Sequence, residues 1–157
     1  MKHRQLLESL DQERVIRAIE EAEQRCSGEI RVHIQPSAHG REVRHVAEKT
    51  FERLGMTKTE LRNGVLLFIL SRDQKFAILG DKGVNDKVSE GYWEAMAGEL
   101  GNRFRAGEFT EGIVDAIEQV GKLLAEHFPF CPTTDVNELT NELSIEHDEQ
   151  HPPESGR

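Results

Sequence analysis

The sequence is short of cysteine and of long apolar runs, and each shortage excludes a class of protein. Its two cysteines, Cys26 and Cys131, form no CxxC pair and no His/Cys cluster, which argues against a zinc site and a secreted disulfide framework. The sequence does not decide whether Cys26 and Cys131 form a disulfide bond with each other. No run approaches 18 apolar residues, and no apolar stretch follows the basic N-terminus, so neither a membrane span nor a signal peptide is expected. We therefore expect a soluble, cytoplasmic protein.

Basic residues are also fewer than acidic residues, which gives the chain a formal net charge of -9. Residues 131–157 carry seven acidic residues and only one basic residue, so the acidity is concentrated in the C-terminal tail. No basic stripe suits a phosphate backbone, and a nucleic-acid partner is not expected. Apolar residues are sparse in this tail, which predicts disorder, with at most a transient helix over 135–146. The predicted organisation is an N-terminal lead (1–9), an α/β domain (10–130) and an acidic tail (131–157).

The pattern of apolar residues predicts a mixed α/β sheet. Residues 64–70 are apolar on both faces, as in a central strand covered on both sides. A four-residue break then requires strand 75–79 to return antiparallel. Residues 29–35 alternate polar and apolar, which predicts a half-buried strand that runs parallel to 64–70 through an intervening helix. Four main helices are expected, with Ser9 or Asp11 as the candidate N-cap of the first and Asp86 as that of the third.

This arrangement brings oxygen-bearing side chains to one edge of the sheet. The candidates stand at the start of the first two strands and after the third: Glu29, Asn63, Asp81, Asn85 and Asp86. Carboxylates, Asn and loop carbonyls are the ligands that Ca²⁺ and Mg²⁺ prefer, so the sequence predicts a divalent-cation site here. The spacing does not match an EF-hand. The alternative is that the Gly-Asp-Lys-Gly segment is a turn, Asp86 a helix cap and Glu29 a solvated strand residue.

The opposite edge of the sheet holds a Ser, His, Asp and Arg set at the carboxyl ends of the parallel strands: Ser37, His39, Asp73 and Arg72. Such a set suggests a hydrolase, but the sequence has no G-x-S-x-G elbow and no glycine loop for phosphate. We therefore assign no catalytic residue. His33, on the polar face of its strand, and His45, on a helix flank, are expected to be solvated.

Four motifs in sequence resemble the TPM domain family: Ser-Gly-Glu-Ile-Arg-Val (27–32), Asn-Gly-Val-Leu-Leu (63–67), Ile-Leu-Gly-Asp-Lys-Gly-Val (78–84) and Phe-Thr-Glu-Gly-Ile (109–113). The similarity spans roughly residues 10–128. It implies a three-layer α/β/α sandwich, binding of divalent cations, calcium in particular, and phosphatase activity in some members, among them a thylakoid acid phosphatase. Glu29 and Asp81 match the family pattern as candidate ligands.

Three functional hypotheses follow from these residues. The first is an accessory or interaction domain that binds Ca²⁺ or Mg²⁺ through Glu29, Asp81 and Asp86. The second is a metal-assisted acid phosphatase acting on phosphate monoesters. In the third, the acidic tail docks another protein of basic character. Cation binding ranks first, because the sequence supplies no dedicated nucleophile or acid–base pair.

Overall fold

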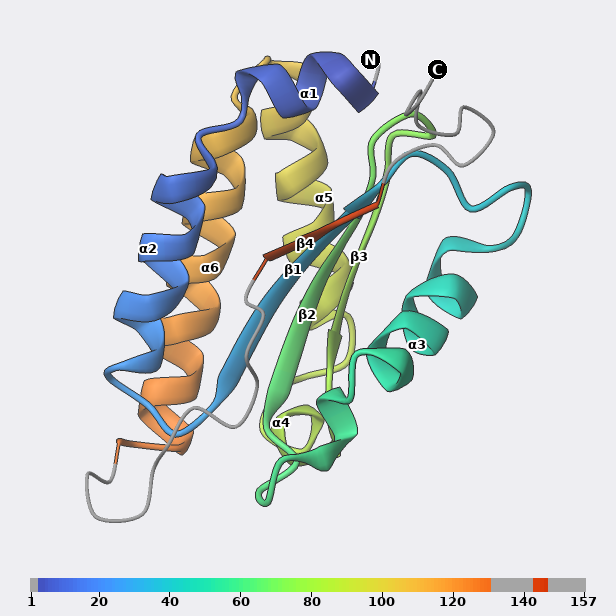
Figure 1. The fold of residues 1–157 in the computed structure, drawn as a ribbon. Helices are drawn as coiled ribbons and strands as arrows, with labels where there is room; N and C mark the ends of the chain where they lie inside the picture. Colours follow the sequence, from blue (N-terminus) through green and yellow to red (C-terminus); the bar gives the residue numbers. More distant parts are fainter. Residues whose placement is uncertain (1–2, 131–142, 147–157) are drawn as a thin grey trace, which may run out of the picture.

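A four-stranded mixed sheet forms the centre of the molecule and carries helices on both faces (Figure 1). This computed structural model describes residues 3–130 and 143–146. Helix α3 covers one face, while α2, α5 and α6 cover the other. The elements in chain order are α1 (His3–Ser9), α2 (Gln12–Glu23), β1 (Glu29–Gln35), α3 (Val43–Arg53), η1 (Met56–Lys58), β2 (Gly64–Leu70), β3 (Lys75–Gly80), α4 (Lys82–Asn85), α5 (Tyr92–Arg105), α6 (Phe109–His127) and β4 (Leu143–Ile145).

The strand order β3-β2-β1-β4 confirms the predicted topology and extends it. Strand β1 pairs parallel with β2, from Glu29 opposite Gly64 to Gln35 opposite Leu70. Strand β3 returns antiparallel against β2, as the four-residue break requires. The short strand β4 adds to the outer edge of β1 in parallel. The three-layer α/β/α sandwich with a mixed sheet is thus confirmed.

Two apolar clusters lie on the two faces of the sheet. The larger joins Val32 and Leu67 to α2, α5 and α6, and the smaller joins Leu66 and Phe68 to α3 and η1. Alternation along each strand separates the clusters, because successive side chains point to opposite faces. No helix in the described part of the chain is long and apolar enough to cross a bilayer.

The helices match the prediction from the sequence at one terminus and differ from it at two. Asp11 caps α2 as predicted, and its side chain accepts a hydrogen bond from the Arg14 amide at 3.1 Å. Asp86 does not cap the long helix; that prediction is wrong, because Asp86 is the C-cap of α4, and α5 starts at Tyr92 after Gly91. The N-terminal lead also contains a helix, α1, whose Leu6 is fully buried against the larger cluster.

Two solvation predictions are wrong. Strand β1 is buried along all seven residues instead of on one face, and the side chain of His33 is only 1% exposed. His45 is exposed, as expected. Disorder is also the wrong expectation for residues 143–146, because they include β4 and lie on β1. The remainder of the tail, including Cys131, lies outside the described residues.

Candidate functional site

The predicted cation-binding edge is organised by one row across three strands. Glu29 pairs with Gly64, and the Asp81 amide donates to the Gly64 carbonyl at 2.9 Å. Glu29 lies on the α3 side of the sheet, because the next residue, Ile30, lies in the larger cluster on the other face, and Asp81 directly follows the end of β3. Both are buried, at 4% and 7% exposure, and their joint use as cation ligands stays a prediction.

Asp81 is the best-defined acid of this edge. Arg62 binds it with two hydrogen bonds, from Nε to Oδ2 at 2.6 Å and from Nη2 to Oδ1 at 2.9 Å. The same Oδ1 accepts from the Lys82 amide at 2.8 Å, which makes Asp81 the N-cap of α4. The bond to Asp81 raises the pKa of Arg62 above its usual range. Both carboxylate oxygens are therefore already engaged, and a cation has to compete with Arg62.

Arg62 reaches Asp81 from an unusual backbone conformation. Its φ is +51°, in the left-handed region that a residue with a Cβ adopts at a cost of about 1–3 kcal/mol. Its carbonyl accepts from the Gly83 amide at 2.9 Å, and a Cβ added at Gly83 would lie 2.7 Å from that oxygen. The second glycine of the Gly-Asp-Lys-Gly segment thus lets α4 approach the carbonyls before β2.

Asn63 and Asn85 are held by bonds within the fold. The Asn63 side chain is 1% exposed and donates to the Ser27 carbonyl at 3.2 Å, which ties the starts of β1 and β2 together. The Asn85 Oδ1 accepts from Trp93 Nε1 at 2.8 Å, while Asp86 is exposed after α4. Among residues 3–130 and 143–146, no three His, Cys, Asp or Glu side chains gather to form a metal-binding group. A cation would have to draw on carbonyl and amide oxygens as well.

At the opposite edge, the hydrolase-like residues tie two loops together. Ser37 Oγ donates to Asp73 Oδ2 at 3.1 Å, and the same oxygen accepts from the Ala38 amide at 3.1 Å. His39 takes part through its backbone amide, which donates to Ser37 Oγ at 2.9 Å, and not through its ring. Asp73 thus binds the serine directly, which differs from a Ser-His-Asp relay, where the acid orients the histidine.

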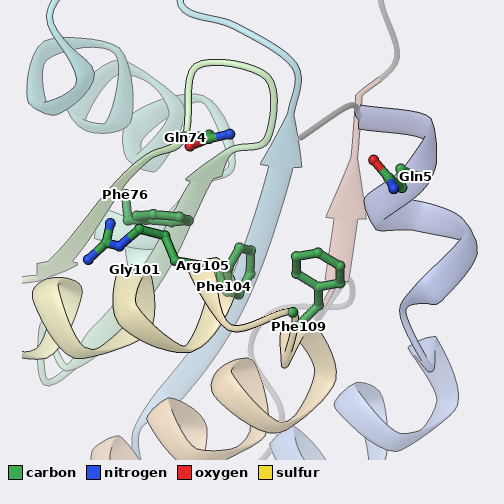
Figure 2. Close-up of a pocket in the computed structure, with 8 residues that line it drawn as sticks. Gln5, Gln74, Phe76, Gly101, Phe104, Arg105 and Phe109 are labelled. Atoms are coloured by element: carbon green, nitrogen blue, oxygen red, sulfur yellow. The ribbon is translucent and has the colours of Figure 1, made fainter.

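Sequence reasoning missed a cavity of about 330 Å³ between the β2–β3 turn, α1, α5 and α6 (Figure 2). Phe76, Phe104 and Phe109 form its aromatic wall, in which successive ring centroids lie 5.0 and 5.2 Å apart in edge-to-face contact. The other lining residues are polar or small: Gln5, Gln74, Gly101, Arg105 and Gly107. None of the lining residues is an acid, His, Cys or Ser, so the cavity offers contact surface without an acid–base pair.

Sequence reasoning also missed a buried polar network on β1. His33 bonds to Ser144 Oγ through Nδ1 at 2.6 Å and to Gln35 Oε1 through Nε2 at 2.9 Å, and its ring stacks on Phe68. Burial lowers the pKa of His33 below its usual value, more than its bond to Gln35 and the nearby Glu146 raise it. The signal in the sequence is the alternation of polar and apolar residues over 29–35, which a buried polar face produces as well as a solvated one.

Comparison with known proteins agrees with the motifs quoted above. The sequence matches the TPM domain over residues 1–123. The NMR structure of the BA42 protein from the psychrophilic bacterium Bizionia argentinensis is 38% identical, with a TM-score of 0.77 over 87% of this chain and 95% of that one. An N-terminal domain from P. gingivalis has the same fold at 19% identity, with a TM-score of 0.63 over 74% of this chain and 76% of that one. No curated protein matches. With the family matched over most of its length, the chain belongs to the TPM domain family.

Proposed function

We propose that this TPM domain binds a divalent cation, calcium in the first place, at the edge formed by Asp81 and the turn before β2. The observation that carries the proposal is the concentration of oxygen atoms there. The Asp81 carboxylate lies beside the turn whose Leu61 and Arg62 carbonyls pack against Gly83. Carboxylate and carbonyl oxygens together are the ligands that Ca²⁺ takes in loops opened by glycine.

In this proposal, the Arg62 guanidinium occupies the position beside Asp81 that the cation takes when it binds. Its guanidinium neutralises the buried Asp81 carboxylate, as a bound cation would, and its side chain is 35% exposed. The arginine can therefore turn toward solvent when the cation arrives, while the backbone of its turn stays in place. Glu29 adds negative charge from the same row of the sheet, and Asp86 adds charge from the end of α4.

The remaining candidates have supporting roles. Asn63 fixes the distance between β1 and β2 through Ser27, and Asn85 fixes α4 against Trp93. Neither needs to contact the cation. A domain that binds a cation without a nucleophile suits an accessory or interaction role, in which the cation sets the conformation of this edge.

A residue-resolved NMR titration of the full chain with CaCl₂ tests the proposal. We expect amide shifts at residues 28–29, 61–64 and 80–86, reversed by a chelator, and no comparable shifts around Ser37 and Asp73. Thermal melts provide a second readout, since calcium at about 100 times its Kd would add about 2.7 kcal/mol to the free energy of unfolding.

Two variants and one matched control sharpen that experiment. Asp81→Asn should abolish the shifts, whereas Arg62→Gln should strengthen binding, because the competing cation is removed. Asp73→Asn, which alters an aspartate that joins loops at the other edge, should bind calcium like the wild type. The proposal is overturned if neither wild type nor Arg62→Gln responds, or if Asp81→Asn responds equally.

Phosphatase activity stays a prediction from the family resemblance. Among the residues that the structure describes, the hydrogen-bond partners of the Asp81 carboxylate are Arg62 and the Lys82 amide, neither of which is a nucleophile, so cation binding is the better supported of the two functions. Hydrolysis of a chromogenic phosphate monoester with Ca²⁺ or Mg²⁺ at mildly acid pH tests it on the same samples. Turnover that Asp81→Asn removes and Asp73→Asn leaves intact would establish the enzyme.

A further inference from the structure

The outer edge of β1 is completed by a segment from the far end of the chain. Val32, His33 and Ile34 pair in parallel with Leu143, Ser144 and Ile145, and the Glu146 amide donates to the Ile34 carbonyl at 2.7 Å. In Figure 1 this strand, β4, lies along β1 on the side away from β2. The contact has the geometry by which peptides add to a sheet edge.

Each position of the docked segment meets a different chemical surface. Leu143 and Ile145 pack against the larger apolar cluster. Ser144, on the opposite face, bonds to His33 at 2.6 Å. Glu146 pairs with Arg53 of α3 at 2.8 Å and approaches His33 Nε2 at 3.5 Å. The docked segment therefore presents apolar, hydroxyl, apolar and acidic side chains in that order, each to a surface of matching chemistry.

The fold limits this docking edge to a short length. The backbone amide of Ile30, two residues before the paired stretch, is occupied by the Glu23 carboxylate of α2 at 2.8 Å. Pro36 follows the strand directly and has no amide to donate. The stretch around Val32–Ile34 is therefore the part of this edge that can pair with another strand, and its length equals that of the three-residue strand β4. An unprotected edge of this kind pairs readily with other chains, and proteins commonly cover such edges.

We propose that the edge of β1 is a peptide-docking site for an extended segment of another protein with the pattern apolar–Ser/Thr–apolar–Asp/Glu, and that residues 143–146 occupy it as a built-in competitor. The backbone pairing supplies affinity, while His33 and Arg53 read the hydroxyl and the acid. Because the built-in segment competes, an external peptide binds with an apparent Kd equal to its intrinsic Kd divided by the fraction of chains in which the edge is open. This site is separate from the Asp81 edge and does not rest on cation binding.

Opening the edge in the full chain tests the proposal. Ser144→Pro should release the segment, because proline cannot donate a ladder bond and is disfavoured inside a strand. The probe is a fluorescein-labelled peptide with the sequence of residues 141–148, Asn-Glu-Leu-Ser-Ile-Glu-His-Asp. By fluorescence anisotropy it should bind Ser144→Pro at least about tenfold more tightly than wild type. NMR shifts of the Val32–Ile34 amides locate the bound peptide.

Controls separate strand docking from simple charge attraction. Ser144→Thr keeps the hydroxyl that bonds to His33 and favours strands, so its edge should stay covered and bind the probe like wild type. In the Ser144→Pro background, Arg53→Gln should weaken the probe several-fold, and a probe with Gln in place of the Glu that follows Ile should lose that dependence. Arg44→Gln is the matched control, because Arg44 is an exposed arginine on the same helix whose partners are Glu48 and Glu94.

Three outcomes would overturn the proposal. One is equal binding of the probe to wild type and Ser144→Pro with unshifted Val32–Ile34 amides. Another is equal weakening by Arg53→Gln and Arg44→Gln, which would show that only net charge matters. The third is that the probe binds neither Ser144→Pro nor a second opened variant, Glu146→Pro, which lacks the backbone amide that donates to the Ile34 carbonyl.

Discussion

The two faces of β1 are buried to the same extent by opposite chemistry. Toward α2, α5 and α6 the strand presents Ile30, Val32 and Ile34, which are 0–2% exposed and lie in the larger apolar cluster. Toward α3 it presents four polar side chains that are 1–9% exposed: Glu29, Arg31, His33 and Gln35. Burial of polar groups is tolerated where each finds a hydrogen-bond partner, whereas burial of apolar groups needs only contact.

The polar face therefore depends on distant segments in a way that the apolar face does not. Arg31 donates from Nη1 to the Leu54 carbonyl at 3.1 Å, and His33 needs Ser144 from the C-terminal part of the chain. These bonds are directional, so displacing one segment leaves a buried polar atom unsatisfied. The apolar face is therefore held by contact within one cluster, while the polar face couples β1 to the end of α3 and to β4.

The largest expected effect is a cavity on the apolar face. Leu67 is fully buried in β2 within the larger cluster. Leu67→Ala should lower the free energy of unfolding by about 2–5 kcal/mol, since it removes buried methyl groups and leaves a cavity. Urea denaturation measures this as a lower midpoint at an unchanged m-value. Leu61→Ala is the control, because Leu61 is 54% exposed and its truncation should change stability by less than about 0.5 kcal/mol.

A smaller effect is expected when the polar face loses one partner. His33→Leu keeps an apolar contact with Phe68 but leaves the Ser144 hydroxyl and Gln35 amide oxygen without the ring, at a cost of about 1–3 kcal/mol. Ser144→Ala in the same chain should recover part of this loss. A double-mutant cycle should therefore give a coupling of about 0.5 kcal/mol or more. Strictly additive losses would show that the His33–Ser144 contact does not hold β4.

Most of the fold could be predicted because its determinants are local. The apolar run of β2, the four-residue turn to β3 and the Asp11 cap each depend on residues close in sequence. The burial of His33 depends instead on α3 and on Ser144, which is 111 residues away, and no periodicity in residues 29–35 reveals that cover. Alternation shows that a strand has two different faces, and it does not show that the polar face is solvated.

The candidate site also has a part that the sequence predicts and a part that it does not. Strand order is enough to predict that Glu29 and Asp81 stand at ends of strands on either side of β2, where Glu29 pairs with Gly64 and the Asp81 amide donates to the Gly64 carbonyl. The engagement of Asp81 by Arg62 could not be foreseen, because it requires the left-handed backbone at Arg62 and the close approach of Gly83. The prediction that Asp86 caps the long helix failed because α4 intervenes between Asp81 and that helix. The aromatic cavity joins residues from four elements and has no sequence signature.

The polar face also predicts a pH dependence that the apolar face lacks. Burial lowers the pKa of His33 in the folded protein below its ordinary value of 6.5, while Glu146, Arg53 and Arg31 face the ring. The unfolded chain therefore binds the proton first, so this contribution to stability is full above about pH 6.5 and is lost as the pH falls through the lowered pKa.

His33→Gln should flatten this dependence. The free energy of unfolding, measured by urea denaturation between about pH 7.5 and pH 5.5, should fall less in the variant than in the wild type. His45→Gln is the control, because His45 is exposed on α3, and its slope should match that of the wild type. An identical slope in all three proteins would assign the pH dependence to groups other than His33.

The smallest expected effect concerns the ion pair at the rim of the polar face. Arg53 and Glu146 lie 2.8 Å apart with side chains 55% and 37% exposed, so solvent screens their attraction. Glu146→Gln should lower stability by less than about 1 kcal/mol, and added salt should shrink the difference. The same substitution nevertheless removes the negative charge that positions the end of β4 against α3. Amide hydrogen exchange at Val32–Ile34 should accordingly rise more than global stability falls. If exchange at these amides is unchanged in Glu146→Gln, β4 is held by its backbone and Ser144 alone.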